Sequence, residues 1–454
     1  MSDTTNQRRI LTIAVLASFV AFLDGTVVTV ALPAIADELG GGLTTQQWVV
    51  DAYLLTLGAL ILVAGSVSDA YGRVLVMRIG LLGFGIASVA IAAAPTAEFL
   101  IAARAVQGAA GAFLVPSSLA LITSTFQGAA QSRAIGTWTA WTTSAMIAGP
   151  LIGGLFVDYL SWRLAFLINV VPIAITFWLL ARAKLRDSRR ADASIDWLGA
   201  ILCTAGLGAL VFRLIEQPRL GWTSPWTWVS LVGGGILFAF FLLRQRVARN
   251  PVLPLELFRV RNFWTGNVAT ALIYGALALN GFVVGVYLQQ GAGLSATLAG
   301  LASLPSTLLL ILLSSRVGAL AGTWGPRLFM TVGPILMGAG ALLLLTVSVD
   351  FSYGWQVLPS MLLMGLGLAV TVSPLTSAIL GSIDTERSGI ASAVNNAVAR
   401  IAGLLAIALL AVVVGGTLDL DGFHRAAIVT AVLMIAGGVV SFAGIRNGAR
   451  PAKV

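Results

Sequence analysis

The chain has 454 residues, of which 58% are hydrophobic and 10% are charged, and its formal net charge is +9. Soluble domains carry about 25% charged residues, so the composition excludes an ordinary soluble protein and indicates one that lies in lipid. Because the basic residues fall between apolar stretches, they are typical of membrane topology, and no nucleic-acid partner is expected.

The apolar stretches have the length of membrane-spanning helices. A span needs roughly 20 apolar residues, since the hydrocarbon core is about 30 Å thick and a helix rises about 1.5 Å per residue. We predict fourteen spans, at residues 10–35, 48–67, 77–94, 98–122, 135–157, 164–182, 196–215, 226–243, 263–288, 297–315, 328–346, 356–378, 389–414 and 425–445.

Arginines are distributed unequally between the two sets of loops. Clusters at 182–190 and 244–261, together with Arg450 and Lys453 in the tail, lie on one side, while the opposite loops hold few basic residues. Positively charged loops face the cytoplasm. We therefore expect a multi-pass protein of the bacterial cytoplasmic (inner) membrane with both termini in the cytoplasm.

Ionisable residues inside the first four spans are candidates for chemistry. Asp24 lies near the middle of span one, Asp51 lies in span two, and Arg104 lies well inside span four. A charge in hydrocarbon costs at least about 2.5–3.5 kcal/mol, so such residues normally face a cavity or a partner. Gln107 shares a helix face with Arg104. We assign Asp24, Asp51 and Arg104 to proton coupling; the alternatives are a structural ion pair for Asp24 and a structural anchor for Arg104.

Span five contains Ala145-Met-Ile-Ala-Gly149-Pro150-Leu-Ile-Gly153-Gly154. Pro150 removes one backbone hydrogen bond, which predicts a bend. Gly149 and Gly153 are four residues apart and allow a neighbouring helix to approach closely. Generic helix packing is the alternative interpretation.

Two long charged connections, 183–193 and 244–262, bracket spans seven and eight, which therefore look inserted. We predict an N-terminal six-helix bundle at 1–182, an inserted helix pair at 183–262 and a C-terminal six-helix bundle at 263–454. The glycines of Gly65–Arg73 recur at the same spacing in 318–327, which suggests duplication. Many secondary transporters consist of two related bundles with a site near the bilayer midplane.

Several motifs resemble those of one family. The span-five string looks like the AxxxGPxxGG antiporter motif of the major facilitator superfamily, and 23–35 and 104–112 resemble the first-span and fourth-span motifs of its fourteen-span drug:proton antiporters. This resemblance implies an all-α integral membrane protein of two six-helix bundles plus two inserted helices. It also implies proton coupling at Asp24, proton transfer at Arg104, prevention of leak by span five, and a cytoplasmic latch formed by Asp69, Gly72 and Arg73.

The expected function is proton-coupled efflux of lipophilic cationic or neutral amphipathic compounds by alternating access. The cation assignment rests on Asp24 and Asp51, because no acid lies inside spans nine to fourteen. Aromatic residues on span five could attract a cation, although anchoring at the membrane interface competes. The candidate cavity residues are Asp24, Gln107, Trp138, Trp141, Tyr274, Asn280, Gln289, Asn396 and Arg400.

Other classes find less support in the sequence. No Walker loop, nucleophile elbow or metal-ligand cluster is present, so we expect no enzyme activity, no cofactor and no metal, with the proton gradient as the energy source. The expected partners are small lipophilic substrates, protons and the bilayer, and a monomer is expected. Two alternatives stay open: a dedicated exporter of one metabolite or antibiotic, and a membrane scaffold or sensor that does not transport.

Overall fold

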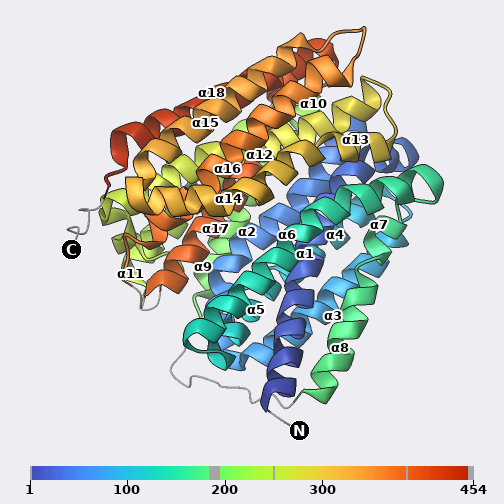
Figure 1. Ribbon diagram of the computed structural model, residues 1–454. Helices are drawn as coiled ribbons and strands as arrows, with labels where there is room; N and C mark the ends of the chain where they lie inside the picture. Colours follow the sequence, from blue (N-terminus) through green and yellow to red (C-terminus); the bar gives the residue numbers. More distant parts are fainter. Residues whose placement is uncertain (1–2, 184–194, 249–250, 385–386, 448–454) are drawn as a thin grey trace. The chain divides into compact units, whose positions relative to one another are not determined.

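The computed structural model describes residues 3–183, 195–248, 251–384 and 387–447, and its regular structure there is helical (Figure 1). Within these ranges, 14 helical segments are long and apolar enough to cross a membrane, which confirms the fourteen expected spans. Most of the predicted basic cluster at 182–190, part of the connection at 183–193, residues 249–250, and the tail residues Arg450 and Lys453 lie outside the described residues.

Six spans form the first half of the chain. They comprise α1 (Asp3–Leu39), α2 (Gly42–Tyr71), α3 (Arg73–Ala92), α4 (Ala97–Gly111) continued by α5 (Leu114–Thr125), α6 (Gly128–Tyr159), and α7 (Leu164–Leu167) continued by α8 (Val170–Arg182). Two further spans follow, α9 (Trp197–Ile215) and α11 (Pro225–Val247), with the short α10 (Gln217–Leu220) between them.

The second half begins with a short 3-10 helix, Leu255–Arg259. Its spans are α12 (Arg261–Gln290), α13 (Ala296–Ala302) continued by α14 (Leu304–Trp324), α15 (Pro326–Leu343) with a 3-10 turn at Leu344–Thr346, α16 (Leu358–Leu380) preceded by a π-helical turn at Tyr353–Val357, α17 (Ser388–Val414) and α18 (Leu420–Gly444).

Several helices are longer than their apolar windows. The second span was expected at 48–67, but α2 runs from Gly42 to Tyr71, and the tenth span continues to Trp324 rather than ending at 315. An apolar window measures only the hydrocarbon crossing, whereas a helix continues through the polar interface until a residue stops it. For α2 that residue is Gly72, whose φ of 101° strongly favours glycine.

The sixth span is interrupted, and the interruption matters for the site. α7 ends at Leu167 and α8 begins at Val170, so Ile168 and Asn169 lie in the junction. Pro172 follows in the first turn of α8 and has no backbone N–H to donate to the Ile168 carbonyl. The break therefore follows from the sequence, and it places the Asn169 side chain in a buried position.

The chain folds into two compact units. The first contains Met1–Glu216, Leu220–Val252 and Ser295–Gly300; the second contains Gln217–Arg219, Leu253–Leu294 and Leu301–Val454. In the first unit α1 packs along α6, α2 packs against α4 and α9, and α9 packs against α11. In the second unit α12 packs against α17 and α18, and α15 against α16 and α18. The predicted domain division at 182/183 and 262/263 stays a prediction.

Candidate functional site

The Asp24 carboxylate lies at the centre of a buried polar cluster in the first unit. Arg104 donates from Nη1 to Asp24 Oδ2 at 2.6 Å, and Gln107 donates from Nε2 to Asp24 Oδ1 at 3.0 Å. The same Arg104 nitrogen lies 2.5 Å from Gln107 Oε1. Asp24 and Gln107 are fully buried and Arg104 is 1% exposed. Two of the predicted coupling residues and one predicted cavity residue thus form a single network.

Two further side chains complete the cluster. Asn169 Nδ2, from the α7–α8 junction, donates to Asp24 Oδ1 at 2.9 Å. Ser88 Oγ, on α3, accepts from Gln107 Nε2 at 2.9 Å and from Asn169 Nδ2 at 3.4 Å. Both oxygens of Asp24 are therefore hydrogen-bonded, by three donors in all. The predicted cavity role of Asp24 and Gln107 stays a prediction, because neither exposes any surface in this conformation.

The Arg104 guanidinium is also fixed from other directions. Its Nε donates to the Val49 carbonyl at 2.9 Å, and the ring of Tyr53 lies 4.3 Å from its central carbon. Removing one partner of a buried ion pair costs about 3–5 kcal/mol because the remaining charge is left uncompensated. This contact is therefore a strong local constraint on how α1 lies against α4.

The span-five motif brings α6 close to α1 near Asp24. A Cβ on Gly149 would clash with the Thr26 hydroxyl and lie 2.9 Å from Thr26 Cβ, and a Cβ on Gly153 would lie 2.8 Å from Val30 Cγ2. Thr26 Oγ1 also lies 3.3 Å from the carbonyl of Ala145, one turn before Gly149. Only glycine permits this approach, and Thr26 is two residues from Asp24.

The rest of this motif contacts the start of the tenth span. Gly154 lies close enough to Thr297 that a Cβ would be 2.5 Å from its Cα, and a Cβ on Gly300 would be 2.6 Å from the carbonyl oxygen of Pro150. Residues Ser295–Gly300 belong to the first unit. The five motif residues therefore form a surface of small side chains and bare backbone.

Asp69, in the last turn of α2, and Arg73, at the start of α3, form an ion pair with each other, which the sequence analysis did not predict. Arg73 Nη2 lies 3.4 Å from Asp69 Oδ1, and Arg73 Nη1 donates to the Ala120 carbonyl at 3.2 Å. Gly72 lies between the two helices at its positive φ. The pair is partly exposed, so it contributes about 0–1 kcal/mol. Its role as a latch stays a prediction.

Asp51 is separate from the Asp24 cluster. Its side chain is fully buried, and neither of its oxygens has a hydrogen-bond partner among the described residues. On α2, Val49 and Tyr53 face Arg104, whereas Asp51 lies on the other side of the helix. An unpartnered buried carboxyl remains a candidate proton carrier.

The other predicted cavity residues differ in their surroundings. Trp138 packs edge-on against Phe22 with ring centroids 6.5 Å apart, whereas Trp141 is 58% exposed. Gln289 donates to the Gly285 carbonyl of its own helix, and Asn280 is half-buried. Tyr274 and Arg400 are half-buried and Asn396 is exposed. All five second-half residues belong to the second unit.

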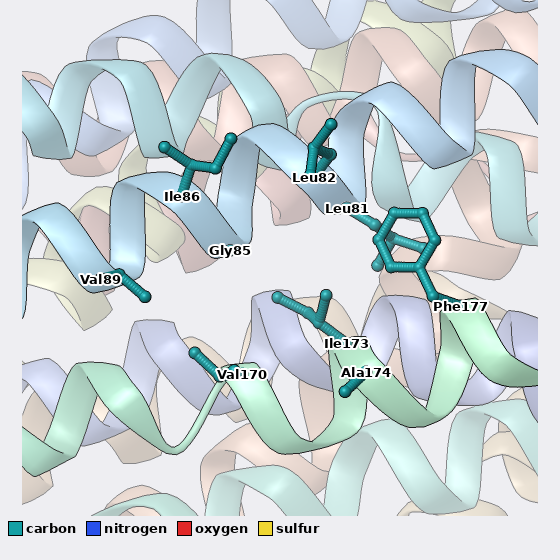
Figure 2. Close-up of a pocket in the computed structure, with 9 residues that line it drawn as sticks. All are labelled: Leu81, Leu82, Gly85, Ile86, Val89, Val170, Ile173, Ala174 and Phe177. Carbon is teal, nitrogen blue, oxygen red and sulfur yellow. The ribbon is translucent and has the colours of Figure 1, made fainter.

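One groove in the first unit lies apart from these residues. It has a volume of about 360 Å³ and lies between α3 and α8, where Leu82, Ile86, Val170 and Phe177 are among its lining side chains (Figure 2). Its lining is almost entirely apolar, and Ile86 is 61% exposed. Such a surface suits lipid chains and offers nothing to orient a polar substrate.

Sequence reasoning missed Asn169 and Ser88. Neither belongs to a motif with a recognisable spacing, and a single Asn or Ser within an apolar span is common where helices pack. The available signal was Asn169 three residues before Pro172, because a break in the helix frees a neighbouring polar side chain to turn inward. No group of three or more metal-binding side chains occurs among the described residues.

The chain is similar in sequence to known membrane transporters. The family model described as Major Facilitator Superfamily matches residues 14–407. A methylenomycin A resistance protein of Streptomyces coelicolor is 34% identical over 90% of this chain and 85% of that protein. A puromycin resistance protein of Streptomyces alboniger is also 34% identical (88% and 80%), and a multidrug resistance protein of Mycobacterium tuberculosis is 31% identical (91% and 77%).

Solved structures show the same fold. A peptide transporter structure matches with a TM-score of 0.72 at 14% identity and covers 98% of each chain. A D-xylose-proton symporter matches with a TM-score of 0.68 at 13% identity, covering 97% of this chain and 98% of the other. With the family match over most of its length and resistance proteins among its relatives, the chain belongs to the Major Facilitator Superfamily and is a membrane transporter, not an enzyme.

Proposed function

We propose that this transporter is a proton-coupled exporter of small lipophilic molecules. Its relatives are named for resistance to methylenomycin A, to puromycin and to several drugs, which supports efflux as the direction of transport. The basic loops favour cytoplasmic termini, and the bacterial relatives favour the inner membrane. In this orientation the substrate enters from the cytoplasm or the inner leaflet and protons enter from outside.

The Asp24 cluster is the observation that carries the proposal. Three donors occupy the two oxygens of Asp24. A proton on Asp24 would remove the negative charge that attracts Arg104 and turn an acceptor site into a donor, so protonation weakens these contacts and favours a conformation in which at least one of them has opened. Protonation is thereby linked to a movement of α1 against α4 or α8. Such a link between proton uptake and conformation is what proton-coupled transport requires.

The energies involved are of matching size. Removing one partner of a buried ion pair costs about 3–5 kcal/mol, which sets the scale for separating Asp24 from Arg104. One proton crossing a membrane gains about 2.3 kcal/mol per 100 mV, and a pH difference adds about 1.4 kcal/mol per unit. One proton can therefore offset the separation of Asp24 from Arg104 under ordinary bacterial gradients.

Other predicted residues have supporting roles in this proposal. Asp51 provides a second buried carboxyl for the proton path, since its oxygens have no partner among the described residues. The close packing of Gly149 and Gly153 against α1 keeps the helices sealed while they move. Asp69 and Arg73 hold the loop after α2. No cofactor is required, because the gradient supplies the energy.

Efflux from proteoliposomes tests the proposal. The purified chain is reconstituted, methylenomycin A or puromycin is loaded on the side equivalent to the cytoplasm, and a pH gradient is imposed. We expect gradient-dependent movement of at least one compound, its loss with a protonophore, and its loss in Asp24→Asn. Equal rates with and without the gradient would remove proton coupling from the account.

A dedicated exporter of one compound is the second candidate, because two of the relatives are named for a single antibiotic. Expression in an efflux-deficient strain separates the two cases. Resistance to one compound among unrelated dyes, antiseptics and antibiotics favours dedication, and resistance to many favours multidrug export. No transport of any compound by the folded chain would favour the scaffold or sensor.

A further inference from the structure

Arg400 is a cation in the middle of a membrane-spanning helix. It lies twelve residues after the first residue of α17 (Ser388) and fourteen before its last (Val414). Its side chain is half-buried and forms no hydrogen bond or ion pair with any residue that the structure describes. Such a position is costly in hydrocarbon, and arginines found there usually serve a partner or a substrate.

The second unit offers no carboxylate to neutralise this charge within the membrane. In the described helices from α12 to α18, the only acidic residue is Asp421, which lies in the first turn of α18. By contrast, Arg104, a buried arginine of the first unit, has Asp24 beside it. Arg104 and Arg400 therefore differ in the feature that decides whether an external anion can bind.

The turn of α17 that holds Arg400 lies beside the part of α12 that carries Tyr274. Asn395 Nδ2 donates to Thr270 Oγ1 at 2.8 Å, and a Cβ on Gly403 would lie 3.1 Å from Ala278 Cβ. Tyr274 lies between Thr270 and Ala278 on the same face of α12, one turn from each. These two contacts bracket the turn of α17 that holds Arg400, and an electrostatic interaction joins Arg400 to Tyr274.

Asn396 adds a second accessible polar group on the same side of α17. It lies one turn before Arg400 and is exposed. The exposed apolar residues Leu409 and Val412 lie on the opposite side of this helix and suit lipid. Arg400 and Asn396 on one side of α17, and Tyr274 on the neighbouring α12, therefore offer a guanidinium, an amide and a phenol, with no acid among them.

We propose that Arg400, with Tyr274 and Asn396, binds an anionic group, a carboxylate or one of similar geometry, on the exported molecule. This inference rests on the proposed export function and names its substrate class. A guanidinium binds a carboxylate through paired hydrogen bonds, and the phenol and amide supply further donors. The cationic substrate expected from the sequence relied on Asp24 and Asp51, but the oxygens of Asp24 are already hydrogen-bonded and Asp51 exposes no surface.

Equilibrium binding of three matched probes tests the substrate class. The probes are 1-pyrenebutyrate, its methyl ester and 1-pyrenebutylamine, which share one apolar body and differ in charge. Binding is measured by fluorescence with the full chain in nanodiscs, and the signal from protein-free nanodiscs is subtracted. We expect the butyrate to bind at least tenfold more tightly than the amine, with the ester weaker than the butyrate.

Substitutions locate the site. Arg400→Gln should weaken butyrate binding about tenfold or more and leave the amine unchanged, since a charge-assisted hydrogen bond is lost. Arg400→Lys, which keeps the charge, should retain part of the affinity, and Tyr274→Phe should cause a smaller loss. Arg316→Gln is the matched control, because Arg316 is exposed on α14 and has no partner among the described residues. Thermal unfolding confirms that each variant is folded.

The outcomes are distinct from those of the efflux test, because binding needs no gradient. Absence of butyrate binding to the wild type, equal binding of butyrate and amine, or an unchanged butyrate affinity in Arg400→Gln would each overturn the proposal. An exporter of cations alone would pass the efflux test and fail this one. A chain that binds the butyrate through Arg400 without gradient-driven transport would do the reverse.

Discussion

Replacing Gly149 with alanine adds one methyl group at the closest approach of α6 to α1. The new Cβ would clash with the Thr26 hydroxyl, lie 2.9 Å from Thr26 Cβ and lie 3.2 Å from the backbone nitrogen of Val27. The backbone nitrogen and a β-branched side chain cannot move away without moving α1. Overpacking of this kind costs about 1–3 kcal/mol, and it displaces the segment that carries Asp24.

Unfolding of purified protein by a denaturing detergent measures this cost. We expect Gly149→Ala to lower the free energy of unfolding by about 1–3 kcal/mol. We also expect its gradient-driven transport to fall by more than the loss of folded protein accounts for. Gly25→Ala and Gly136→Ala are the matched controls, because a Cβ at either position meets nothing within 4 Å. A variant as stable and active as the controls would refute the claim that this contact holds α1 in place.

Two further predictions follow from buried polar contacts. Asn169→Leu removes one donor from Asp24 Oδ1 and should lower the free energy of unfolding by about 1–3 kcal/mol. Asn280→Leu, at a side chain without a hydrogen-bond partner among the described residues, should change it much less. Equal losses in the two variants would argue against the role of Asn169. For Asp196, burial alone would raise the pKa, but hydrogen bonds from Gly199 N–H and from the side chains of Arg244 and Gln245 outweigh it and hold the pKa below its ordinary value. The stability that ionised Asp196 contributes is therefore present above the ordinary Asp pKa of about 3.9 and is lost as the pH falls below it. In a series of thermal unfolding measurements, the difference in stability between the wild type and Asp196→Asn should therefore become smaller as the pH is lowered. A constant difference from neutral pH to pH about 3 would contradict this reasoning.

The fold follows from the sequence because a membrane leaves few alternatives. Only closed hydrogen-bonding structures cross hydrocarbon, so apolar stretches of the right length predict helices directly. The ends of those helices are harder to predict, as at α2, because the interface tolerates polar helical turns. The interruption between α7 and α8 depends on one proline, Pro172, whose effect depends on its neighbours.

The candidate site could be predicted only in part. Asp24, Arg104 and Gln107 stand out because their polarity is costly inside a span, but their mutual contact depends on how α1 packs against α4. Asn169 and Ser88 could not be singled out from the sequence, because a neutral polar side chain in a span costs little free energy. Arg104 and Arg400 look alike in the sequence, and only the structure shows that Arg104 is paired with an acid, whereas Arg400 forms no hydrogen bond or ion pair with the described residues.

In the proposed cycle Asp24 gains and loses a proton, and infrared difference spectroscopy observes this directly. Spectra of the reconstituted protein are recorded while the pH is cycled, and the C=O stretch of a protonated carboxyl group is followed. We expect a band that changes with pH in the wild type and that keeps its Asp24 component in Asp51→Asn. That component should be absent in Asp24→Asn. Identical difference spectra for the wild type and a folded Asp24→Asn variant would contradict the proposed cycle.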